Sequence, residues 1–181
     1  MNVTLANDRL RAWDKRGRYV FTKNMLRGIF WEDSDIAFVR GLARLVEAGT
    51  LQRACRGVYV YPHARCADGY AIEHVATALR PTEYNYVSLE SALSEYGAIS
   101  QIPMGTLTVV TSGQKGRVKT PYGIIEFTHT ERPCAELVTG LLRQPGRPMR
   151  IAKKDVAWRD LLRVRGRSQA EMLVDMEELA V

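Results

Sequence analysis

The sequence has few of the features that mark secreted or membrane proteins. It contains only three cysteines among 181 residues, too few and too uneven in number for a disulfide framework. No apolar run approaches the roughly 20 residues that a membrane-spanning helix needs. The first ten residues mix Asn, Asp and Arg, unlike a secretory signal. We therefore expect a cytoplasmic protein with reduced thiols and no membrane contact.

Motifs for catalysis and for metal or cofactor binding are also scarce. The sequence contains no Gly-rich phosphate loop, no nucleophile-elbow serine and no carboxylate cluster with metal spacing. His63 and Cys66 are spaced like a metal-ligand pair, but a structural zinc site usually needs two such pairs. His74 falls within an expected helix, and Glu126 and His129 would point to opposite faces of an expected strand. We expect no enzymatic activity, no cofactor and no bound metal.

The positive charge is concentrated in the first third of the chain. The protein carries a formal net charge of +6, with a sequence pI near 9.4. Residues 1–62 hold 11 Lys and Arg against 6 Asp and Glu, whereas residues 63–181 hold 15 against 14. A basic segment joined to a nearly neutral one predicts that the first meets a polyanion and the second has another role.

The elements expected in the first segment follow the order of a winged helix-turn-helix. Thr22 and either Asp33 or Ser34 are good helix caps, and residues 55–57 reverse a hairpin. Residues 63–69 have little periodicity and are expected to form a linker. The predicted elements are a helix over 5–15 with Leu5, Leu10 and Trp13 on one face, a short strand over 19–21, a helix over 23–30, a third helix ending before Gly49, and a hairpin over 50–62.

The remaining sequence predicts a mixture of helices and strands, with Ser88 as a helix cap. We therefore expect an α+β fold, with a winged helix-turn-helix over residues 1–66 and an α+β domain over residues 67–181. The predicted elements of the second domain are helices over 70–79, 88–96, 135–143, 155–164 and 168–179, a strand over 107–111, and a hairpin joining strands 117–120 and 124–129.

The third helix carries the strongest indication of function. Arg40 and Arg44 lie one turn apart, with the small residues Ala37 and Gly41 beside them. A face of this kind is typical of a helix that enters the DNA major groove, since arginine binds guanine or phosphate and small neighbours allow close approach. Most apolar positions fall on the opposite half of the helix, namely Phe38, Val39, Leu42, Ala43, Leu45 and Val46.

Other basic residues extend the expected DNA-binding surface. Arg53 and Arg56 lie on or at the tip of the hairpin, where a wing would follow the DNA backbone. Lys23 and Asn24 open the second helix, and helix N-termini are favourable sites for phosphates. We expect these residues, together with the third helix, to bind double-stranded DNA.

Five segments in order resemble AbiEi-type antitoxins. In the first part of the chain these are residues 45–53 (LVEAGTLQR) and 56–62 (RGVYVYP). In the second part they are 86–93 (YVSLESAL), 120–129 (TPYGIIEFTH) and 149–152 (MRIA), the last preceding a helix that contains Asp160. The resemblance spans roughly residues 18–162. Residues 153–160 (KKDVAWRD) depart from the family, whose members often read Glu-Lys/Arg-Ala-Leu-Leu-Asp there.

The resemblance implies the antitoxin of a type IV toxin–antitoxin system. The N-terminal winged helix would bind inverted repeats upstream of its own operon and repress it. The C-terminal domain would counteract a nucleotidyltransferase toxin, without a stable complex between the two proteins. The DNA-binding roles of the family transfer to Arg40 and Arg44 on the recognition helix and to Arg53 and Arg56 on the wing.

Two other functions compete with this interpretation. The chain fits a stand-alone transcriptional regulator whose second domain senses a ligand or forms a dimer. It also fits a nuclease with a restriction-like α+β core, which would need two or more acidic ligands near a lysine on adjacent strands. Only Glu126 stands in a suitable place for such a ligand, so a nuclease is the weakest of the three hypotheses.

Overall fold

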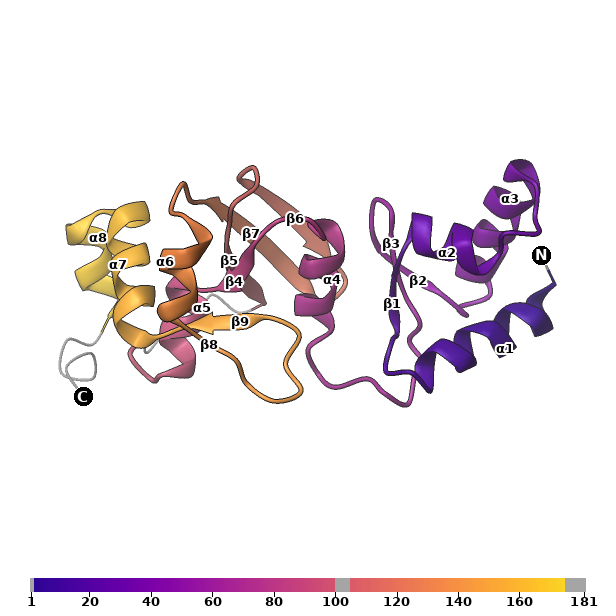
Figure 1. The fold of residues 1–181 in the computed structure, drawn as a ribbon, viewed down its shortest axis with the longest axis horizontal. Helices are drawn as coiled ribbons and strands as arrows, with labels where there is room; N and C mark the ends of the chain where they lie inside the picture. The colour runs from indigo at the N-terminus through magenta and orange to yellow at the C-terminus, as the bar shows by residue number, and fades with distance from the viewer. Residues whose placement is uncertain (1, 100–104, 175–181) are drawn as a thin grey trace. The chain divides into compact units, whose positions relative to one another are not determined.

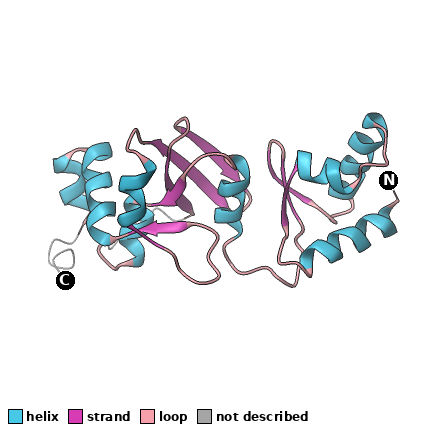
Figure 2. Ribbon diagram, in the orientation of Figure 1, coloured by secondary structure: helices cyan, strands magenta, loops and turns pink. Residues whose placement is uncertain are grey.

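The computed structural model describes residues 2–99 and 105–174 of the chain. It divides into two compact units, Met1–Leu79 and Arg80–Val181 (Figure 1). Each unit combines helices and strands, which confirms the α+β fold class (Figure 2). The sequence placed the division at residue 66, whereas the contacts assign the following helix, α4 (Ala71–Leu79), to the first unit.

The first unit has the predicted element order of a winged helix-turn-helix. Its strands pair in the order β1-β3-β2, and both pairings are antiparallel. Helix α4 packs on β1 and β3 of this sheet. Before α4, the elements are α1 (Val3–Asp14), β1 (Val20–Thr22), α2 (Lys23–Ile29), α3 (Asp35–Glu47), β2 (Gln52–Cys55) and β3 (Val58–Val60).

Local side-chain chemistry explains where these helices begin and where the hairpin turns. The Thr22 hydroxyl accepts the Met25 N–H at 3.1 Å and begins α2. Ser34, rather than Asp33, caps α3 by accepting the Ala37 N–H at 3.3 Å. Gly57 has a φ of 79° in the turn between β2 and β3, a conformation that glycine adopts without strain.

The buried face of α1 differs from the expected one. Leu10 is fully buried as predicted, but Leu5 is 43% exposed and Trp13 is half-buried. The buried positions are instead Ala6, Leu10 and Asp14. Hydrophobic periodicity missed this face because it contains a small residue and a carboxylate, and neither scores as a core residue.

The segment expected to be a linker is attached to the first unit. The Asp14 carboxylate accepts the backbone N–H groups of Arg65 and Cys66 at 3.1 and 2.9 Å. These hydrogen bonds hold the pKa of Asp14 below its usual range, while burial and the neighbouring Asp14 raise the pKa of the Cys66 thiol to about 11. Tyr19 donates its hydroxyl to Asp68 at 2.7 Å. Residues 63–69 therefore form an anchored loop and not a free linker.

The second unit is built on a mixed sheet with the strand order β6-β7-β5-β4-β9-β8. Strand β5 runs parallel to β7, and β4 runs parallel to β9, whereas the other pairings are antiparallel. Helix α5 packs on β5 and α7, and α7 packs on α8 (Figure 1). The elements are β4 (Asn85–Val87), α5 (Leu89–Glu95), β5 (Thr106–Thr111), β6 (Gly116–Thr120), β7 (Gly123–His129), α6 (Cys134–Thr139), β8 (Leu141–Leu142), β9 (Arg150–Ala152), α7 (Lys154–Arg165) and α8 (Arg167–Leu173).

Most predicted elements of this unit are confirmed, including the β6–β7 hairpin, and two need correction. The helix expected over 135–143 ends at Thr139, because residues 141–142 pair with β9 as the short strand β8. The helix expected over 168–179 corresponds to α8, which ends at Leu173; residues 175–179 lie outside the described residues. Strands β4 and β9 were not predicted, since each has three residues and shows no alternation.

A buried carboxylate joins the sheet of the second unit to α7. Asp160, which is 1% exposed, accepts hydrogen bonds from the Tyr86 hydroxyl at 3.1 Å and from the Ser88 hydroxyl at 2.7 Å. Arg132 forms an ion pair with the same carboxylate. Ser88 stands at the N-cap position of α5, as predicted, but its side chain makes no capping hydrogen bond.

Candidate nucleic-acid interface

Helix α3 has one buried face and one exposed basic face. Phe38, Leu42 and Leu45 are at most 4% exposed and form part of the core of the first unit. Arg40 and Arg44 lie one turn apart on the exposed face. The structure therefore presents both predicted recognition arginines at the surface of the third helix.

The neighbours of these arginines differ from those expected. Gly41 is buried and Ala37 is half-buried, so neither provides the predicted open flank. Val39, assigned to the core by its hydrophobicity, is 53% exposed, and Ala43 is also exposed. Together with Ile36, which is 66% exposed, they make the outer face of α3 partly apolar. Gly41 lies within the buried face of α3, because a residue without a side chain fits where the helix packs closely against its neighbours.

The hairpin and the start of α2 lie beside this face. Arg53, Arg56, Lys23 and Asn24 are all exposed, as predicted. The Lys23 N–H donates to the Gly57 carbonyl at 2.8 Å, which ties the start of α2 to the hairpin turn. A groove of about 400 Å³ is lined from four elements: by Lys23 of α2, by Arg53 of β2, by Tyr59 of β3, and by Val39, Leu42, Ala43, Val46 and Glu47 of α3.

Arg27 fixes the turn between α2 and α3. Its guanidinium donates to the Phe30 carbonyl at 3.1 Å and to the Asp35 carboxylate at 3.2 Å. It also lies 5.5 Å from the centroid of the Phe38 ring. Sequence reasoning missed this residue, because its partners lie on both sides of the turn and no motif marks them. Arg27 thus orients the helix that carries Arg40 and Arg44.

Metal-ligating side chains are not clustered in the part of the chain that the structure describes. Across 2–99 and 105–174, no group of three or more His, Cys, Asp and Glu side chains is placed to hold a metal ion. Glu126, the one acidic residue that suited a nuclease, lies 3.8 Å from the Arg165 guanidinium and pairs in register with Arg117. Within the same ranges, no helix is long and apolar enough to span a membrane.

The fold and its basic surface place the first unit in the winged helix-turn-helix class. Residues 8–62 match a protein family described as "Transcriptional regulator, AbiEi antitoxin". The match confirms the resemblance noticed in the sequence over this part of the first unit, and the description of the family is that of a transcriptional regulator. No match was found among curated proteins.

Among solved structures, the chain is similar to the crystal structure of the RV2827C protein from Mycobacterium tuberculosis. The TM-score is 0.58, the sequence identity is 14%, and the alignment covers 97% of this chain and 70% of the other. At this identity the similarity concerns the fold alone. It extends over both units, whereas the family match is limited to the first.

Proposed function

We propose that the first unit binds operator DNA and represses the operon of this protein, as the antitoxin of a type IV toxin–antitoxin system. The observation that carries this proposal is that Arg40 and Arg44 are exposed on α3, while other residues of the same helix line a groove together with Lys23 and Arg53. A protruding helix flanked by a basic hairpin suits the major groove and the adjoining backbone. The operator is double-stranded DNA containing inverted repeats in the promoter.

The residues of this face divide into two roles. Arg40 and Arg44 donate to guanine or to phosphate, while Arg53 and Arg56 on the hairpin neutralise backbone phosphates. The exposed apolar side chains of Ile36, 66% exposed, and its neighbours on α3 contact thymine methyl groups, since only apolar contact distinguishes that group in the major groove. Where the arginines bind bases and not phosphates, the operator half-site contains guanine, and the apolar contacts favour thymine beside it.

The second unit supplies the antitoxic activity against a nucleotidyltransferase toxin, without forming a stable complex with it. Support comes from the family description of the first unit and from the segments that resemble antitoxins in the second. Two of those segments, 86–93 and 149–152, meet in space because β4 pairs with β9, and Tyr86 and Ser88 donate to Asp160 on the helix that follows. They accordingly build the framework of the unit, on whose surface the antitoxic residues lie.

Matched alanine variants test the DNA-binding part of the proposal. Arg40→Ala should weaken binding to the promoter fragment by about 1–3 kcal/mol and reduce the preference over random DNA. Lys15, exposed at the C-cap position of α1, serves as the control. Lys15→Ala should affect both DNAs about equally, because contacts to phosphate carry no sequence information. Indistinguishable effects of the two substitutions would remove α3 from the recognition role.

A cellular assay separates repression from antitoxicity. Cells should carry this protein together with the proposed nucleotidyltransferase toxin, and a reporter under the promoter of the operon. Arg40→Ala should raise reporter expression and still protect the cells, because the two activities are assigned to different units. Loss of protection together with loss of repression, in a variant that remains folded, would contradict this division of labour.

A further inference from the structure

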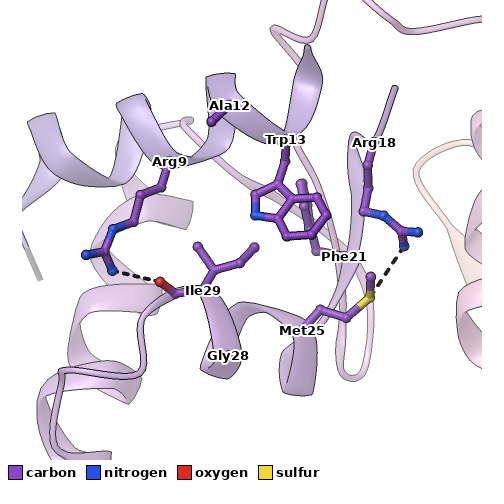
Figure 3. A pocket seen from close by; sticks show the side chains of 8 residues that line it. All are labelled: Arg9, Ala12, Trp13, Arg18, Phe21, Met25, Gly28 and Ile29. Carbon is purple, nitrogen blue, oxygen red and sulfur yellow. Dashed lines mark hydrogen bonds between the residues drawn. The ribbon is translucent and has the colours of Figure 1, made fainter. Parts of the chain in front are cut away.

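An apolar pocket of about 400 Å³ lies on the first unit, between α1, β1 and α2. Ala12 and Trp13 come from α1, Phe21 comes from β1, and Met25, Gly28 and Ile29 come from α2 (Figure 3). Two arginines, Arg9 and Arg18, complete the lining. The volume falls in the range of sites for small molecules, and the predominance of apolar side chains is typical of such sites.

The aromatic residues give the pocket a shape suited to a flat ring. Phe21 is fully buried, whereas Trp13 is half-buried and offers part of its indole to the space. Figure 3 shows the indole between the two arginines, with Ile29 and Met25 facing it from α2. Aromatic rings gain from offset or edge-to-face stacking, and a methionine thioether adapts to a ring edge.

The guanidinium groups of the two arginines differ in the hydrogen-bond partners that they already have. Arg9 donates to the Ile29 carbonyl at 2.7 Å and to the Glu32 carboxylate at 2.8 Å. Among the described residues, the guanidinium of Arg18 contacts only the Met25 sulfur at 3.8 Å and the Trp13 ring, whose centroid is 6.0 Å away. Sulfur is a weak acceptor, so Arg18 retains donors in the fork geometry that fits a carboxylate.

We infer that this pocket binds a small aromatic carboxylic acid. The ring lies against Trp13, between α1 and α2, and the carboxylate accepts a bidentate pair of hydrogen bonds from Arg18. A monocarboxylate fits better than a phosphate ester, because the remaining lining is apolar and Arg9 is already paired. The inference stands on the geometry of the first unit and does not depend on DNA binding.

The side-chain signals of the three tryptophans provide a direct assay on the full chain. The indole N–H resonance of Trp13, identified by Trp31→Phe and Trp158→Phe variants, is followed while 2-naphthoate is added. We expect a saturable shift of this resonance, caused by the ring current of naphthalene, and little change at the other two. The uncharged 2-naphthamide should bind about tenfold more weakly or worse, since it lacks the charge that Arg18 pairs with.

Three variants identify the site. Arg18→Met should weaken 2-naphthoate binding by about tenfold or more, to the level of the amide. Arg11→Met, on α1 but outside the lining of the pocket, should not weaken it. Gly28→Leu should abolish binding of both compounds by filling the pocket; a Cβ atom at Gly28 meets nothing within 4 Å, so the fold accommodates the change. Circular dichroism verifies that each variant is folded. Absence of a Trp13 shift in the parent protein, or equal binding by the Arg18 variant, would overturn the inference.

Discussion

The steepness with which salt weakens DNA binding tests the proposed interface quantitatively. The proposed interface carries five exposed cations: Lys23 on α2 and Arg53 on β2, which line the groove, Arg40 and Arg44 on α3, and Arg56 at the hairpin turn. Each phosphate neutralised contributes about −0.9 to the slope of log affinity against log salt concentration. If all of these cations contact phosphates, the slope is about −4.5. If Arg40 and Arg44 contact bases and only the other cations contact phosphates, the slope is about −2.7.

Fluorescence anisotropy with a labelled promoter fragment measures this slope on the full-length protein. Between about 50 and about 200 mM salt, affinity should fall roughly 40- to 500-fold per bound chain. Arg53→Ala should reduce the magnitude of the slope by about 0.9, because one phosphate contact is lost. Arg11→Ala removes a charge of the same type from α1, outside the interface, and should leave the slope nearly unchanged.

Two results would refute this reasoning. A slope near zero would mean that few counterions are released, and the concentration of charge in the first unit would then have no role in binding. A steep slope that Arg11→Ala reduces as much as Arg53→Ala would show that general basicity attracts the DNA and that the hairpin has no special position.

Three further predictions concern the framework that holds these surfaces. Asp160→Ala should lower the free energy of unfolding by about 3 kcal/mol in chemical denaturation, because Arg132 and two hydroxyls lose a buried acceptor. Asp155 is exposed on the same helix, and Asp155→Ala should change the free energy of unfolding by less than about 0.5 kcal/mol. The pKa of Asp14 lies below its ordinary value of 3.8, so its carboxylate stabilises the fold above that pH, and the stability lost in Asp14→Asn should shrink as the pH falls below about 4. Gly28→Ala should raise the free energy of unfolding by about 0.5–1 kcal/mol, as measured by thermal or chemical denaturation, because the site is helical and a Cβ atom there meets no neighbour. An unchanged or lower free energy of unfolding would contradict the open geometry at Gly28.

The elements of the first unit were predictable from short-range chemistry. Thr22 and Ser34 begin helices by accepting an N–H three residues ahead, and Gly57 allows the hairpin turn; each signal lies within a few positions of the element it sets. The exposure of Arg40 and Arg44 followed from helical periodicity. The same periodicity failed for Val39, because hydrophobicity does not distinguish a side chain that packs in the core from one available to a ligand.

The contacts that hold the elements together could not be predicted in this way. Asp14 reaches residues more than 50 positions away, and Asp160 joins a helix to Tyr86 across 74 positions. A carboxylate in an expected helix gives no sign of such partners, since its role depends on tertiary approach. The apolar pocket was missed for the same reason, because Trp13 was assigned to the core face and Arg18 has no marker in the sequence.

Helix α2 connects the two sites proposed for the first unit. Its first residue, Lys23, lines the groove beside α3, and its backbone N–H is bonded to the hairpin turn at Gly57. Its other side, through Met25 and Gly28, forms a wall of the pocket beneath Trp13. A helix of seven residues is too short to bend independently at its two ends, so a ligand that displaces one side also displaces the other. An aromatic acid in the pocket would therefore act on the helix whose first residue belongs to the DNA-binding surface. When the acid binds, the Arg18 guanidinium leaves the Met25 sulfur and pairs with the carboxylate of the acid. The resulting change in operator affinity depends on how far α2 moves during this exchange.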